Sequence, residues 1–159
     1  MNHVAIMKKS RKLIAKILRG EKTIESRWYV NRICPWDQIN AGDTVYFKDS
    51  SEPVTAKANV SKVLQFKNLS PKSVKNILET HGKGIGMDPS EKNIQECAAK
   101  NYCILVFLED AHKIEPLKID KTGYGLMSAW ITVDDINKIN RPADVYRDRG
   151  EELIFETNT

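Results

Sequence analysis

Residues 20–29 read GEKTIESRWY, a stretch in which Ile24 is the only large aliphatic side chain. Side chains alternate across a β-strand, so this pattern predicts a strand over Thr23–Arg27 that leaves a helix through Gly20. One face of that strand then carries a hydroxyl, a carboxylate and a guanidinium in a row. These groups belong to Thr23, Glu25 and Arg27.

Such a polar face is not ordinary protein core, because buried charges need partners. Glu25 and Arg27 lie two residues apart on the same face, so we expect them to pair directly and to leave further donors and acceptors for a ligand. The sequence therefore predicts a pocket lined by Glu25 and Arg27, with Lys22 at its rim. The alternative is an exposed edge strand whose charges discourage aggregation.

Aromatic side chains follow the polar strand closely and alternate with cations. Trp28, Tyr29 and Trp36 are interleaved with Arg27 and Arg32. Stacking surfaces beside cations are typical of sites that hold an unstacked base and its phosphate, so the three aromatic residues are candidate ligand contacts. The alternative is that the tryptophans are ordinary core residues.

The positive charge is concentrated near the N-terminus. Residues 1–32 hold nine Lys and Arg against two Glu, or +7, whereas the remaining 127 residues hold 16 basic and 19 acidic side chains, or −3. This asymmetry favours an anionic partner, with nucleic acid the first candidate. We expect Lys12, Lys16 and Arg19 to contact the nucleic-acid backbone without reading its sequence; a solvated helix face is the alternative.

Hydrophobic periodicity and turn signals predict a mixed α+β fold, a twisted and mostly antiparallel sheet or small β-barrel with helices around it. The predicted strands are His3–Lys8, Thr23–Arg27, Thr44–Lys48, Val54–Phe66, Tyr102–Leu108 and Leu126–Thr132. The predicted helices are Arg11–Arg19 after an N-capping Ser10, Pro71–His81 after an N-capping Ser70, roughly Ser90–Lys100 and a short one at Val133–Ile139. A length of 159 residues without a linker predicts one domain.

Other features exclude several classes of protein. No apolar run is long enough to span a bilayer, and the first ten residues have the wrong order for a signal peptide, so we expect a cytoplasmic protein without membrane contact. Three cysteines without a C-x-x-C pair favour free thiols. The three histidines and these cysteines lack ligand spacing, so we expect no metal and no cofactor. The sequence does not determine the oligomeric state.

Several motifs together resemble the ASCH domain of the PUA-like superfamily. They are G-x-K-T-I-E-x-R-W over residues 20–28, a Pro35-Trp36 step, the Gly42-Asp43 turn before TVYFK, and SAWI at Ser128–Ile131. The resemblance covers about residues 3–140 and leaves a C-terminal extension over 141–159. It implies a small, partly open β-barrel with surrounding helices, and a cleft that receives the polar side chains of the motif.

The same resemblance implies binding of RNA or of a nucleoside or nucleotide. Ser128 and Trp130, which follow a glycine-rich segment, are candidate residues of the cleft wall, although a bend entering a strand is the other interpretation. One branch of the family acts as amidohydrolases on N4-acetylcytidine with a Lys, a Thr and a Glu. The Lys matches Lys22, but the catalytic Thr falls on Glu25, and Glu79 is the nearest acidic residue to the position of the Glu.

Three hypotheses follow from these observations. The first is an RNA- or nucleoside-binding module in which the basic helix takes phosphates and the cleft holds a base. The second is a hydrolase acting on a modified nucleoside or on RNA, with Lys22 and Glu25 as catalytic residues. The third is a protein-interaction domain whose basic face meets an acidic partner.

Overall fold

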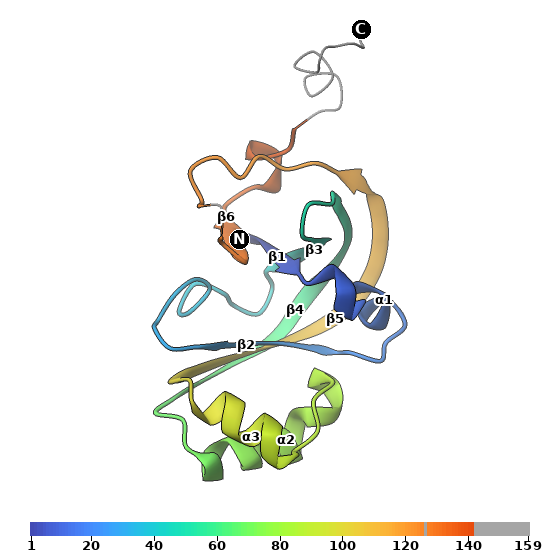
Figure 1. The fold of residues 1–159 in the computed structure, drawn as a ribbon. Coiled ribbons are helices and arrows are strands. Elements are labelled where there is room, and N and C mark those ends of the chain that lie inside the picture. The colour runs from blue at the N-terminus through green and yellow to red at the C-terminus, as the bar shows by residue number, and fades with distance from the viewer. Residues whose placement is uncertain (126, 142–159) are drawn as a thin grey trace, which may run out of the picture.

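A computed structural model describes residues 1–125 and 127–141, in which one six-stranded sheet curls into a half-barrel in the order β2-β5-β4-β3-β1-β6 (Figure 1). The strands are β1 (Asn2–Met7), β2 (Ile24–Tyr29), β3 (Thr44–Asp49), β4 (Val54–Lys67), β5 (Tyr102–Leu117) and β6 (Trp130–Val133). The helices are α1 (Leu13–Leu18), α2 (Pro71–Ile85) and α3 (Glu91–Ala98), with short 3-10 helices η1 (Lys9–Arg11) and η2 (Ile136–Lys138).

Four of the five strand pairings are antiparallel, which confirms the predicted mostly antiparallel sheet. The exception is the parallel pair of β1 and β3, in which Val4 lies opposite Tyr46. The long strands β4 and β5 pair along most of their length with several register shifts, which bend the sheet into its half-barrel shape. Among the described residues β2 pairs with β5 alone and therefore forms one edge of the sheet.

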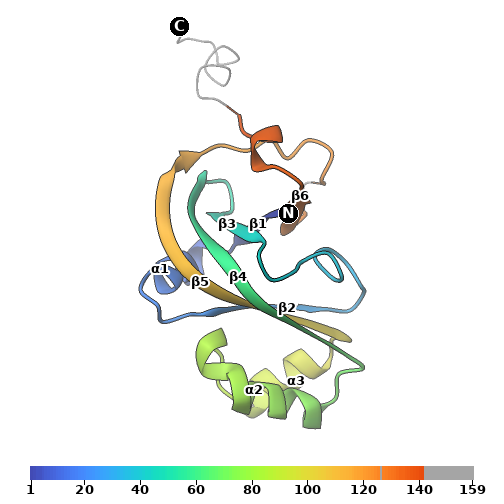
Figure 2. The same cartoon turned by 180° about the vertical axis from the view of Figure 1, so that it is seen from behind.

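Both faces of the sheet near β2 are buried. Ile104 and Val106 of β5 pack with α1 in a core on the concave side, whereas Cys103 and Leu105 point to the other face, where α2 and α3 cover them. Figures 1 and 2 show α2 and α3 together on one side of β2, with α1 near β5. This arrangement explains why the first half of β5 is an unbroken apolar run instead of an alternating one.

The predicted helices are partly confirmed. Ser70 caps α2 by accepting a hydrogen bond from the Ser73 N–H, and the helix runs to Ile85, beyond the predicted end. The predicted N-cap at Ser10 is wrong, because Ser10 lies inside η1 and Lys12, at φ 53°, separates η1 from α1. The C-terminal helix is also shorter than predicted, since Val133 belongs to β6.

The predicted strand over Leu126–Thr132 begins only at Trp130 within the described residues, and Leu126 itself lies outside them. The C-terminal extension beyond residue 141 also lies outside the described part of the chain. Cys34, Cys97 and Cys103 are free thiols. Among the helices of residues 1–125 and 127–141, none has the length and apolar character that a bilayer span requires.

A buried polar network joins the two ends of the described chain. His3 is fully buried; its Nε2 lies 2.8 Å from Asp43 Oδ2, and the Trp130 Nε1–H donates to its Nδ1 at 3.1 Å. Since indole nitrogen can only donate, Nδ1 must accept, so His3 carries its proton on Nε2 and donates it to Asp43. Trp130 is 3% exposed. The expectation that Trp130 offers a surface to a ligand is therefore wrong: its ring fills the core.

Candidate functional site

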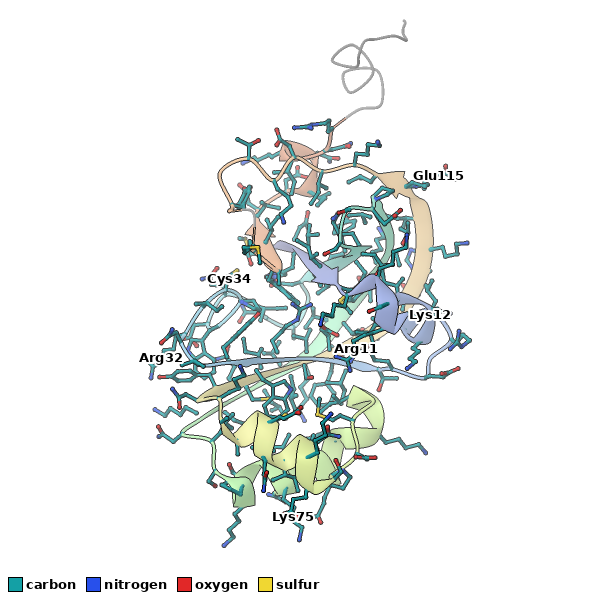
Figure 3. The ribbon with its side chains drawn as sticks, in the orientation of Figure 1. Arg11, Lys12, Arg32, Cys34, Lys75 and Glu115 are labelled. Atoms are coloured by element: carbon teal, nitrogen blue, oxygen red, sulfur yellow. The ribbon has the colours of Figure 1, made fainter. Side chains whose placement is uncertain are left out.

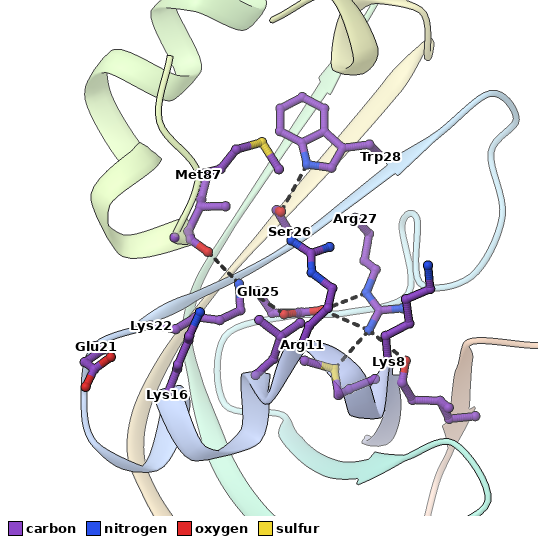
Figure 4. A pocket seen from close by; sticks show the side chains of 15 residues that line it. Lys8, Arg11, Lys16, Glu21, Lys22, Glu25, Ser26, Arg27, Trp28 and Met87 are labelled. Carbon is purple, nitrogen blue, oxygen red and sulfur yellow. Dashed lines mark hydrogen bonds and ion pairs between the residues drawn. The ribbon is translucent and has the colours of Figure 1, made fainter. Parts of the chain in front are cut away.

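A cleft of about 460 Å³ lies where β2 passes between the N-terminal basic segment and the end of α2 (Figure 4). Its wall is formed by residues of β1, η1, α1, β2 and the turn after α2. The polar lining residues are Lys8, Arg11, Lys16, Glu21, Lys22, Glu25, Ser26 and Arg27, and the others are Ile6, Met7, Leu13, Trp28, Ile85, Gly86 and Met87. Five cations against two carboxylates give this lining a formal charge of +3.

Lys22 lies at the bottom of the cleft instead of at its rim, with only 6% of its surface exposed. Its Nζ donates to the carbonyl oxygens of Ile24 at 2.8 Å and Ile85 at 2.7 Å, and lies 3.4 Å from Glu25 Oε1. Burial lowers the pKa of Lys22, and the charge of Glu25 opposes that shift. The ammonium thus joins the start of β2 to the end of α2.

Glu25 is the central carboxylate of the cleft and is 4% exposed. One oxygen faces Lys22, and the other accepts from Arg27 Nε at 2.9 Å, with Arg27 Nη2 at 2.8 Å (Figure 4). The predicted pairing of Glu25 with Arg27 is therefore confirmed. Because two cations share one buried carboxylate, the group of three carries a net positive charge.

Arg27 connects the edge strand β2 to the opposite side of the half-barrel. Its guanidinium donates to the Ala129 carbonyl at 3.2 Å, lies 3.5 Å from the Ile6 carbonyl, and its Cζ stands 5.1 Å from the centre of the Trp130 ring. Neither Glu25 nor Arg27 projects into bulk solvent. β2 is an edge strand, as the alternative interpretation held, but its charged face points inward.

The outer wall of the cleft is basic. Lys8, Arg11 and Lys16 are exposed side chains that line it, and none of them forms an ion pair within residues 1–125 and 127–141. The left-handed residue Lys12 lies between η1 and α1. It turns the chain so that Arg11 and Lys16, from two different helices, border the same cavity.

The other wall is formed by the outer face and free edge of β2. Trp28 Nε1–H donates to Ser26 Oγ at 3.0 Å, which fixes the indole ring beside the cleft. The Leu108 N–H on β5 donates to the Thr23 carbonyl just before β2, so within β2 the main-chain groups of the odd-numbered residues Glu25 and Arg27 point toward β5. In an antiparallel pair the even-numbered ones then face outward, which places the Ser26 N–H and C=O at the free edge.

The fold of this chain is similar to that of several solved structures. It matches crystal structures of ASCH from Zymomonas mobilis and of two mutants of that protein. The TM-score is 0.60 for ASCH itself, at 14% identity over 83% of this chain and 87% of that one. For both mutants the TM-score is 0.62, and the match covers 86% of this chain. One mutant is 13% identical and is covered over 93% of its length, and the other is 14% identical and is covered over 91%. The chain has the ASCH-domain fold. No protein-family model and no curated protein matches the sequence.

In this ASCH fold the sequence-predicted site residues fall into two groups. The cleft brings together Lys22, Glu25, Arg27, Trp28 and Lys16. The remaining predicted contacts, which do not line it, are Thr23, Tyr29, Trp36, Ser128, Trp130, Lys12 and Arg19.

Thr23 precedes β2, is exposed and lies next to Gly84 of α2, so the prediction that it shares the face of Glu25 is wrong. Arg19 pairs with Glu21 and Lys12 is exposed away from the cleft. The Ser128 hydroxyl donates to the Trp130 carbonyl in the turn before β6. Of the three basic residues predicted from helix periodicity, only Lys16 lines the cleft, whereas Lys8 and Arg11, which periodicity does not single out, line it as well.

Candidate groups for other chemistry lie elsewhere in the ASCH fold. Glu79 is exposed on α2, stands 4.0 Å from Lys75 and does not line the cleft. Within the described residues no group of three or more His, Cys, Asp or Glu side chains could hold a metal ion. Glu21, Ser26 and Met87 line the cleft although no sequence pattern marks them; only the tertiary approach of α2 to β2 brings Met87 there.

Proposed function

We propose that this chain binds a phosphorylated nucleoside, free or within single-stranded RNA, in the cleft beside β2. The observation that carries the proposal is that one cavity combines the indole of Trp28 with three cations, Lys8, Arg11 and Lys16, that have no ion-pair partner in the described part of the chain. Phosphate binding needs cations that no protein carboxylate already neutralises, and base binding needs a flat apolar surface. The cleft volume lies within the range of small-molecule sites.

The floor of the cleft supports the same proposal. Lys22, Glu25 and Arg27 are held in place by one another and by main-chain carbonyls, so a ligand meets a preformed polar surface. The Ser26 N–H and C=O at the free edge of β2 form a donor and acceptor pair that suits the hydrogen-bonding edge of a base. The cations then bind phosphate without regard to sequence, and the floor and edge contact the base.

Reversing the charges of the rim is expected to weaken binding. The variant Arg11→Glu/Lys16→Glu should bind uridine monophosphate and short RNA about tenfold or more weakly, and its affinity should respond less steeply to salt, because fewer counterions are released. The measurement is a fluorescence titration at several salt concentrations. An effect confined to one RNA sequence would contradict the assignment of these residues to phosphate.

The matched control is Lys72→Glu. Lys72 is an exposed lysine in the first turn of α2, about 20 Å along that helix from the end that borders the cleft. Its reversal changes the net charge of the protein by two, like each substitution at the rim, and it should leave affinity nearly unchanged. If Lys72→Glu weakens binding as much per charge as the rim variant does, the effect is one of overall charge and the cleft is not the site.

A hydrolase is the second candidate function, because burial lowers the pKa of Lys22 beside a carboxylate in the cleft. As a general base, Lys22 would need a free lone pair. Its Nζ instead donates to two carbonyl oxygens and faces Glu25, and Arg27 occupies the other carboxylate oxygen. These contacts give Lys22 and Glu25 a structural role in the floor of the cleft, which favours a binding function over a catalytic one.

We therefore expect little release of acetate from N4-acetylcytidine and little cleavage of RNA by the purified protein. The measurement is chromatography of the products over long incubations. Robust turnover that disappears in Lys22→Met, with the variant still folded by circular dichroism, would establish the hydrolase instead. A cytoplasmic location, and a protein partner for the basic face, stay predictions from the sequence.

A further inference from the structure

A second cluster, of one cation and two aromatic rings, lies at the other end of β2. Arg32, Trp36 and Tyr102 form it, and we call these three residues the platform. The two rings meet edge to face with centroids 5.0 Å apart, and Arg32 Cζ stands 5.9 Å from the Trp36 centroid and 5.3 Å from that of Tyr102. Figure 3 shows Arg32 at a different end of the sheet from Arg11 and Lys12.

The loop that carries the platform is fixed to the sheet. The Asp37 N–H donates to Gln65 Oε1 at 2.8 Å, and Gln65 Nε2 donates back to Asp37 Oδ1 at 2.8 Å, which ties the loop to β4. On the other side, the Asn101 side chain donates to the Val30 carbonyl at 2.8 Å. The rings are therefore held in place before any ligand arrives, and binding would not have to order them.

The platform has the composition of a base-stacking site. Arg32 is exposed and has no ion-pair partner in the part of the chain that the structure describes. Lys67 lies opposite Tyr102 in the β4–β5 register, so it adds a second cation on the same face of the sheet. A guanidinium plane over aromatic rings stacks on a base, and the adjacent positive charge attracts the phosphate that follows it.

We propose that the platform binds one nucleotide of a single-stranded nucleic acid by stacking its base against Arg32 and the ring pair. Tyr29 of β2 lies opposite Tyr102 and is four positions along the strand from Glu25, a distance of about 13 Å. The platform and the cleft would thus contact different nucleotides of one strand. That joint use rests on the proposed function of the cleft, whereas the platform itself does not.

The ligand chemistry of a stacked base with its phosphate is shared by RNA and DNA. The test therefore titrates the whole protein with an eight-nucleotide uridine RNA, the matching deoxyuridine DNA and uridine monophosphate. Arg32→Ala should weaken binding of at least one octanucleotide about tenfold, the size of one lost stacking contact. Arg32→Lys, which keeps the charge but not the plane, should recover only part of that loss.

The matched control is Lys62→Ala, which removes a cation that stands 5.2 Å from the Phe107 ring elsewhere on the sheet. It should leave the affinity for both octanucleotides unchanged. The platform proposal is wrong if Arg32→Ala binds both octanucleotides as tightly as the wild type does. It is also wrong if Arg32→Lys restores the full affinity. The mononucleotide separates the two proposals, because Arg32→Ala should bind it normally. If the octanucleotide depends on Arg32 while no ligand depends on Arg11 and Lys16, the platform stands and the cleft fails.

Discussion

The substitution Glu25→Ala is expected to destabilise the folded protein by about 3–5 kcal/mol, because it removes the carboxylate shared by the buried Lys22 and by Arg27, whose side chain is only 12% exposed. Lys22 would keep only its carbonyl acceptors, and Arg27 would lose its bond at 2.9 Å. The measurement is urea unfolding followed by circular dichroism. Glu25→Gln should fall between the wild type and Glu25→Ala, since an amide still accepts a hydrogen bond but carries no charge.

The control for Glu25 is the other carboxylate of the cleft. Glu21 is exposed and pairs with Arg19 on the surface, so Glu21→Ala should leave the unfolding midpoint within experimental error. A cost below about 1 kcal/mol for Glu25→Ala would contradict this account, because it would mean that Lys22 and Arg27 do not need the carboxylate. Binding of uridine monophosphate should also fall in Glu25→Ala, since Arg27 would no longer be held in place.

Gly82→Ala is expected to destabilise the protein by about 1–3 kcal/mol and to disturb the cleft, although Gly82 does not line it. A Cβ on Gly82 would lie 2.4 Å from the Met87 carbonyl oxygen, so the backbone after α2 would have to move. That turn is closed by hydrogen bonds from the N–H groups of Gly86 and Met87 to the Gly82 carbonyl. Gly86 and Met87 border the cleft, so ligand affinity should fall along with stability.

Lys83→Ala is the matched control, because Lys83 is the exposed neighbour of Gly82 on the same helix. Alanine is the better helix former, so the change should leave stability and affinity nearly unchanged. The measurements are urea unfolding and the same nucleotide titration. If Gly82→Ala unfolds with the same urea midpoint as the wild type, the turn after α2 adapts to the added methyl group without cost. That result would contradict the argument that α2 positions the cleft.

Local sequence was enough to predict several strands and helices and one pair of charges. Strand alternation placed Glu25 and Arg27 on one face, and their direct bond follows from that local geometry. Ser70 marked the start of α2 because capping depends on residues within one turn. The motifs resembling the ASCH domain also indicated the fold that the structural comparison supports.

Which of these residues meet depends on the tertiary structure. Lys22 is buried because Ile85, 63 residues away, supplies a carbonyl to its ammonium. Trp130 lies in the core, where its indole N–H donates to His3, a residue 127 positions earlier in the sequence. Arg11 lines the cleft while Lys12 does not, because a left-handed residue interrupts the predicted helix. Periodicity reports which face of an element a side chain occupies, whereas the long-range approach of another element decides whether that face is buried, paired or open to a ligand.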